Sequence, residues 1–128
     1  MINHEHAHQV IETYCTAATT KDRDTWLSLF APDATHEDPV GAPVNRGVAA
    51  IGAFFDAGAG QMDLVLHTTA EPIVVGNEAV AFLEARIGTG AERLRLAPIV
   101  DHFVFDADGK IVALRAFVDL AGITPDPE

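Results

Sequence analysis

The sequence predicts an α+β fold, with helices packed on one face of a curved antiparallel sheet. Apolar residues recur at three- and four-residue steps in the first part of the chain, which indicates helices, and alternate in the second part, which indicates strands. The 128 residues, 48% of them hydrophobic, contain no internal repeat or linker. We therefore expect residues 1–128 to form one domain with a packed core.

Three segments have helical periodicity. Residues 5–20 place one apolar stripe on a single face: Ala7, Val10, Ile11, Tyr14, Cys15 and Ala18. A second, shorter helix begins after Asp22 or Asp24, presents Trp26, Leu27, Leu29 and Phe30, and ends at residues 31–33. Residues 48–57 form the third helix, which Gly58 and Gly60 terminate as a C-terminal cap.

Five later segments alternate in polarity and are predicted to be strands: 63–70, 73–75, 79–87, 93–105 and 110–120. Hairpin turns are expected at Gly76-Asn77, at Thr89-Gly90 and at residues 106–109. Pro98 indicates a bulge or an edge position within the fourth of these strands.

Composition excludes several classes of partner. The chain has 19 acidic against 8 basic residues, a net charge of −11, which argues against nucleic acid, anionic membranes and polyanionic substrates. A neutral, apolar small molecule is compatible with this charge. The N-terminus lacks a signal-peptide pattern, no apolar run is long enough to span a membrane, and Cys15 is a lone cysteine, so a cytoplasmic location is expected. His4, His6 and His8 are not followed by further ligands at suitable spacing, so no metal site is expected.

Asp38 lies in the turn-forming segment Glu37-Asp38-Pro39. Pro39 keeps Asp38 out of the helical region and ends an ordinary strand. A carboxylate fixed at such a turn is either a solvated loop acid or an oriented general base, and the local sequence leaves both open.

Asp101 is expected to face the interior, because alternation places it on the same strand face as Ile99, Phe103 and Phe105. If Leu114, Ala116 and Val118 also face inward, Arg115 faces outward and cannot pair with Asp101. Burial would then raise the pKa of Asp101 and make it a neutral hydrogen-bond donor. The alternative is a structural carboxyl satisfied by backbone amides.

Tyr14 lies in the middle of the apolar face of the first helix, where it is either a core residue or a buried phenol that donates a hydrogen bond. If Tyr14, Asp38 and Asp101 converge, they supply one base for carbon and two donors for an enolate oxygen. That set suits proton abstraction next to a carbonyl group.

The sequence resembles the bacterial ketosteroid isomerases, steroid Δ5-3-ketoisomerases of the nuclear-transport-factor-like and polyketide-cyclase-like superfamily. The resemblance is carried by residues 30–41 (FAPDATHEDPVG), 97–103 (APIVDHF) and 109–116 (GKIVALRA). It implies three N-terminal helices on a strongly curved antiparallel (mixed) sheet that encloses a conical cavity. It further implies Asp38 as general base, Tyr14 and protonated Asp101 as oxyanion donors, a division of roles that is an established example of pKa tuning. The resemblance implies a homodimer that pairs through the sheet, and it implies no cofactor.

Two positions depart from the family pattern. Phe55 stands where a second Tyr often supports the oxyanion Tyr, and Val118 stands where an aromatic residue often lies. The expected substrate is a small, apolar, steroid-like ketone, and its candidate binding residues are Val40, Phe55, Val65, Leu83, Phe103, Leu114, Ala116 and Val118.

Two other functions remain open at this stage, since one fold hosts many chemistries. One is a different enzyme of the same fold, such as a cyclase, a dehydratase or an epoxide hydrolase; the last would need an inward Arg, which the alternation does not provide. The other is a non-catalytic binder of apolar ligands, which would be favoured by a solvent-facing Asp38 or a filled pocket.

Overall fold

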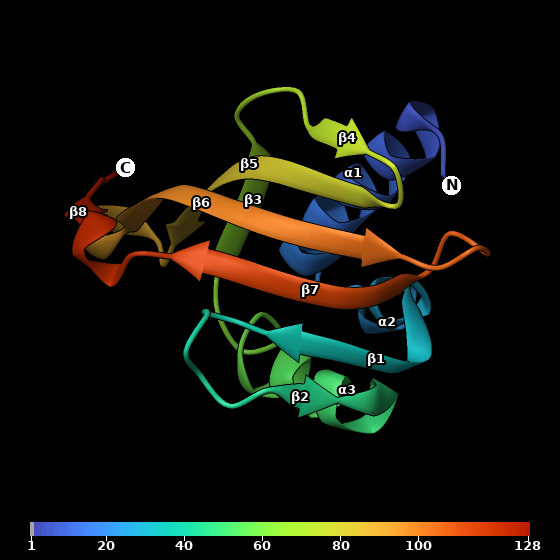
Figure 1. The fold of residues 1–128 in the computed structure, drawn as a ribbon. Coiled ribbons are helices and arrows are strands. Elements are labelled where there is room, and N and C mark those ends of the chain that lie inside the picture. Colours follow the sequence, from blue (N-terminus) through green and yellow to red (C-terminus); the bar gives the residue numbers. More distant parts are fainter. Residues whose placement is uncertain (1) are drawn as a thin grey trace.

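The computed structural model describes residues 2–128 and confirms the α+β fold. Three helices, α1 (His4–Thr20), α2 (Arg23–Ser28) and α3 (Gly47–Ala57), lie on one side of a mixed sheet (Figure 1). Asn3 caps α1, since its side-chain oxygen accepts the His6 N–H at 2.7 Å. Asp22 caps α2 by accepting the Thr25 N–H, which settles the choice between Asp22 and Asp24.

The sheet follows the order β2-β1-β7-β6-β5-β3, with β4 paired to β5 and β8 paired to β6. β1 runs parallel to β7, and every other pairing is antiparallel. The strands are β1 (Phe30–Glu37), β2 (Asn45–Arg46), β3 (Leu64–Thr68), β4 (Ile73–Val75), β5 (Glu78–Ile87), β6 (Leu94–Phe105), β7 (Ile111–Val118) and β8 (Ile123–Pro125). Two single 3-10 turns, η1 (Gly90–Glu92) and η2 (Leu120–Gly122), complete the described elements.

The bulge predicted at Pro98 is present in β6. Leu83 of β5 lies opposite Ile99, but Ala85 lies opposite Leu96, so β6 contains one extra residue in this interval. Leu96 and Ile99 are consequently both buried, although they have opposite parity. Because a bulge bends its strand, it helps to curve the sheet around the helices.

Three local predictions differ from the structure. Phe30 begins β1 instead of ending the second helix, and β1 continues through Pro32, where its pairing with β7 is interrupted. Gly58 ends α3 at a φ of −106°, so it does not form the left-handed cap expected of a glycine there. The strands β2 and β8 were not predicted, because segments of two and three residues are too short to display alternation.

Candidate active site

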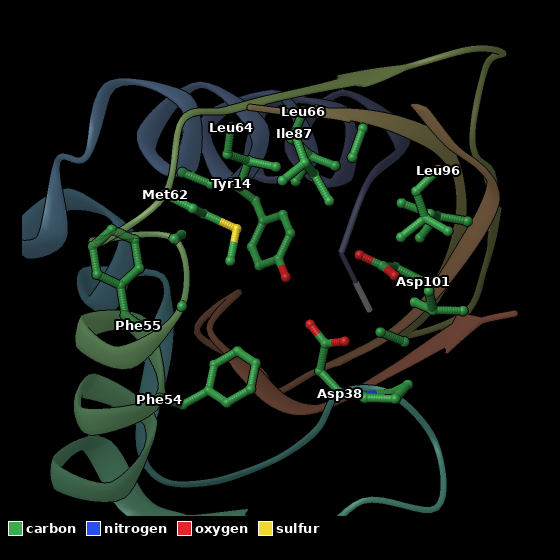
Figure 2. A pocket seen from close by; sticks show the side chains of 18 of the residues that line it. Tyr14, Asp38, Phe54, Phe55, Met62, Leu64, Leu66, Ile87, Leu96 and Asp101 are labelled. Carbon is green, nitrogen blue, oxygen red and sulfur yellow. The ribbon is translucent and has the colours of Figure 1, made fainter. Parts of the chain in front are cut away.

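A cavity of about 280 Å³ lies between the helices and the concave face of the sheet. Its wall is almost entirely apolar, and three polar side chains from distant parts of the chain point into it: Tyr14 of α1, Asp38 after β1 and Asp101 of β6 (Figure 2). The other lining residues are Ala18, Trp26, Pro39, Phe54, Phe55, Gly58, Ala59, Met62, Leu64, Leu66, Ala85, Ile87, Leu96, Ile99, Ala116, Val118 and Leu120.

Tyr14 is held by aromatic packing. Its ring centroid lies 5.6 Å from that of Trp26 and 5.5 Å from that of Phe103, which it meets edge to face. The side chain is buried, and its hydroxyl group points into the cavity (Figure 2). Burial, with smaller contributions from Asp101 and Asp38, raises the pKa of Tyr14 well above its usual value, so the hydroxyl remains a donor at neutral pH.

Asp101 is 2% exposed and lies between two alanines, Ala81 on β5 and Ala116 on β7. These small neighbours offer no side-chain donor or cation, and Oδ1 has no hydrogen-bond partner within residues 2–128. Burial, and secondarily the charge of Asp38, raise the pKa of Asp101 well above its usual value. The orphaned oxygen argues against a structural carboxyl held by backbone amides and leaves a neutral acid that can donate into the cavity.

Asp38 directly follows β1 and is oriented by its neighbours. The Val40 N–H donates to Ala116 O at 2.8 Å, which fastens the segment after Asp38 to β7. Glu37 turns the other way, where its carboxylate accepts from Arg115 Nε at 2.8 Å and from the Gly41 N–H at 3.0 Å. Arg115 therefore faces outward as predicted, and Asp38 points into the cavity (Figure 2).

Burial raises the pKa of Asp38 from 3.8 to about 6. Asp38 is therefore mostly ionised at neutral pH, while its pKa is close enough to neutrality for efficient proton abstraction. Since burial keeps Tyr14 and Asp101 protonated under the same conditions, the site combines one base with two acids.

The structure places three of the eight predicted binding residues, Phe55, Ala116 and Val118, on the cavity wall. The other five do not line it. Leu83, Phe103 and Leu114 face inward but are fully buried in the core. Val65 is 49% exposed because it pairs with outward-facing Arg86, and Val40 lies in a shallow groove on the outer face of the sheet.

Several wall residues were not predicted to line the pocket, chiefly Trp26, Phe54, Met62, Leu64, Leu66 and Leu120. The alternation in β3 contained a usable signal, because Leu64 and Leu66 share one face and Val65 shares the other with His67. Leu120 also had a usable signal, because it continues the parity of Ala116 and Val118 in the predicted strand 110–120, although β7 ends at Val118 and Leu120 lies in η2. Met62 lies in an irregular segment, for which periodicity provides no orientation.

Within residues 2–128, no group of three or more His, Cys, Asp and Glu side chains is arranged to hold a metal ion. Two histidines of α1 contact different parts of the chain: His6 Nε2 is 2.9 Å from Gly109 O, and His8 Nε2 is 3.7 Å from a Glu71 oxygen. In the same part of the chain, no helix has the length and apolarity to cross a membrane.

The family model for SnoaL-like domains matches residues 11–114, a range that contains Tyr14, Asp38 and Asp101. The chain belongs to this family. This SnoaL-like domain is 43% identical over 90 residues to a steroid Delta-isomerase of Nocardioides simplex, a match that covers 70% of the chain and 71% of the relative. The predicted resemblance to the ketosteroid isomerases is thereby confirmed.

Two solved structures show that the same fold extends over nearly the whole SnoaL-like domain. RV0760c of Mycobacterium tuberculosis superposes with a TM-score of 0.84 at 22% identity, covering 97% of this chain and 98% of its own. SalBIII, an epoxide hydrolase/cyclase-like enzyme of pyran ring formation in the polyether salinomycin, gives a TM-score of 0.85 at 23% identity, with coverages of 98% and 100%. At these identities the likeness concerns the fold alone.

Proposed function

We propose that this SnoaL-like domain is a steroid Δ-isomerase, which moves a carbon–carbon double bond of a 3-oxosteroid from the 5,6 to the 4,5 position. The observation that supports this most strongly is the convergence of one raised-pKa base, Asp38, and two buried acids, Tyr14 and Asp101, in one apolar cavity. The steroid Delta-isomerase of Nocardioides simplex, at 43% identity, supports the same conclusion.

In the proposed reaction, ionised Asp38 removes a proton from the carbon between the ketone and the alkene. The electron pair moves onto the ketone oxygen and forms a dienolate, whose negative charge accepts hydrogen bonds from Tyr14 Oη and from the protonated carboxyl of Asp101. Asp38 then returns its proton to the carbon at the far end of the dienolate, and the conjugated ketone is released. Asp38 ends the cycle ionised, so substrate and product are isomers.

The apolar wall contributes in two ways. It binds the steroid rings by removing their surface from water. It also keeps the dielectric constant of the site low, which strengthens the two hydrogen bonds to the oxyanion. Phe55 packs its ring 5.0 Å from that of Trp26 and has no hydroxyl to support Tyr14, so Tyr14 and Asp101 carry the oxyanion without a third donor from Phe55.

Epoxide hydrolysis is less well supported, since no Arg or Lys lies among the described lining residues. Simple binding of an apolar ligand does not account for an inward-pointing, half-buried Asp38 opposite two acids.

The test is direct. Purified protein is mixed with a 5-ene-3-oxosteroid, and the absorbance of the conjugated enone is followed against a buffer blank. We expect catalysed growth of this absorbance. Folded protein that gives no turnover above the blank would refute the proposal for that substrate.

We also propose that the chain acts as a homodimer paired through the outer face of the sheet. Phe117 of β7 is 45% exposed there, next to a shallow groove that Val40, Pro98 and Val100 line. An exposed aromatic side chain beside an apolar groove is typical of an interface.

A further inference from the structure

The mouth of the cavity has an apolar rim. Met62, between α3 and β3, is 36% exposed, and Leu120 of η2 is 63% exposed, yet both line the cavity. The catalytic groups lie at the other extreme, since Tyr14 and Asp101 are 5% and 2% exposed. Apolar surface therefore continues from the buried reacting centre out to solvent.

Hydrogen bonds fix Leu120 in place. The Asp119 side chain accepts the Ala121 N–H at 2.9 Å, and the Asp119 carbonyl accepts the Gly122 N–H at 2.8 Å. Beyond this turn, β8 pairs with β6, and Asp126 forms ion pairs with Arg86 at 2.8 Å and Arg93 at 3.2 Å. The exposure of Leu120 is thus a property of a braced turn and not of a fraying terminus.

The Met62 side of the rim is also braced. The Gly60 N–H donates to Phe55 O at 2.8 Å, and the Gln61 N–H donates to Gly58 O at 2.9 Å. Lys21 Nζ donates to the Met62 carbonyl. Both sides of the mouth are therefore preformed, which lowers the entropic cost of binding a ligand there.

We propose that Met62 and Leu120 bind a part of the substrate that protrudes from the cavity, and that the preferred substrate is a 3-oxosteroid with a neutral aliphatic chain on the ring farthest from the ketone. This inference rests on the proposed function, which places the ketone at Tyr14 and Asp101 and so directs the opposite end of the steroid to the mouth. The cavity of about 280 Å³ is near the lower limit of ligand pockets, so a substituent beyond the rings extends over the rim.

The charge beside the rim selects a neutral chain. Asp63 adjoins Met62, Asp119 adjoins Leu120, and both carboxylates are exposed. A chain that ends in a carboxylate would meet two like charges at the mouth against one opposite charge, the Lys21 ammonium at the Met62 carbonyl, so the rim stays net negative. An alkyl chain instead meets the Met62 thioether and the Leu120 isobutyl group.

Trp26 supplies a binding assay that is independent of turnover. It is the one Trp in the sequence and lines the cavity, so its fluorescence reports occupancy. Three 4-ene-3-oxosteroids are titrated: one with a branched alkyl chain on the terminal ring, one without a chain, and one whose chain ends in a carboxylate. We expect the alkyl-chain ligand to bind wild-type protein at least about tenfold more tightly than the other two, since each buried methylene contributes roughly fourfold.

Leu120→Ser and Met62→Ser should each reduce this preference about threefold or more, whereas Val75→Ser should leave it unchanged, because Val75 is 70% exposed and does not line the cavity. Asp63→Asn should improve binding of the carboxylate-ended ligand relative to the chainless one. Equal affinities for the chainless and alkyl-chain ligands would refute substrate binding at the rim. A loss of preference in Val75→Ser as large as that in the two rim variants would also refute it. Absence of any fluorescence response would overturn it as well.

Turnover separates this inference from the proposed function. The two 5-ene-3-oxosteroids with and without the branched alkyl chain are therefore assayed for isomerisation. A rim-dependent preference in binding without isomerisation of either steroid would support substrate binding at the rim and refute the proposed isomerase activity. Isomerisation of both steroids with equal kcat/KM, in the wild-type protein and in the rim variants, would support the proposed isomerase activity and refute substrate binding at the rim.

Discussion

Asp38→Asn should lower activity and alter the pH dependence of stability at the same time. The substitution keeps the size of the side chain and removes its ability to accept a proton. Loss of a positioned general base lowers the rate by roughly two to four decades. The buried carboxylate also destabilises the folded state at neutral pH, because folding removes the charge from water.

The magnitude of the stability effect follows from the pKa of Asp38, which burial raises from 3.8 to about 6. A carboxyl whose pKa is raised in the folded state binds more protons there than in the unfolded state. Its contribution to the unfolding free energy is therefore fully present at low pH and is lost as pH rises through the pKa of the folded state. Relative to Asp38→Asn, the wild-type protein should therefore lose about 1.4 kcal/mol of unfolding free energy between about pH 5 and about pH 8.

The assay is urea unfolding of both proteins at these two pH values, together with steady-state turnover at neutral pH. Asp33→Asn is the matched control, since Asp33 is an exposed Asp on β1, the strand that Asp38 follows, and the charge change is identical. The control should show wild-type turnover and a wild-type pH dependence.

Two results would refute the reasoning. Full activity of Asp38→Asn would show that Asp38 is not the base. A difference in unfolding free energy that does not change with pH would show that Asp38 is not desolvated in the folded protein, even if activity were lost.

Three further predictions concern other parts of the molecule. Asp101→Leu should lower kcat by roughly two to three decades without lowering the unfolding free energy, because it removes an oxyanion donor and an orphaned polar atom together; a collapse of the fold in circular dichroism would support a structural role instead. Burial lowers the pKa of His36 to about 4, so His36 contributes stability that is lost as pH falls below the pKa of the unfolded histidine. The wild-type protein should therefore lose about 2 kcal/mol of unfolding free energy between about pH 8 and about pH 5 through His36, and His36→Phe should abolish this loss. An unaltered pH dependence in urea unfolding would contradict this. Phe117→Asp should convert the proposed dimer to a monomer in gel filtration, and a wild-type protein that already elutes as one chain would exclude the dimer.

His36 and Asp38 have opposite effects on stability over the same pH range. His36 is 0% exposed, its Nε2 lacks a hydrogen-bond partner within residues 2–128, and its ring packs 4.6 Å from that of Phe54. Between about pH 8 and about pH 5, acid charges His36 in the unfolded state while the buried ring stays neutral, which favours unfolding. Over the same range acid neutralises the buried Asp38 carboxylate, which favours folding, so the wild-type profile is flatter than that of either single variant.

The sequence by itself determined the identities and approximate directions of the three polar groups. Tyr14 follows from helical periodicity and Asp101 from strand alternation, both of which are local and depend only on the backbone period. The strand end at Asp38 follows from Pro39, which also acts locally. The resemblance to the ketosteroid isomerases then distinguished Asp38 from Glu37.

Only the tertiary structure decided which inward residues border empty space. Leu114 and Ala116 share one face of β7, but Leu114 is in the core and Ala116 is on the cavity wall. The helices lie behind one end of the sheet, and the other end, toward β8, extends past them (Figure 1). Pairing register turned Val65 outward, and the bulge at Pro98 turned Leu96 inward. Wall and rim depend on distances between elements, and periodicity within one element contains no information about them.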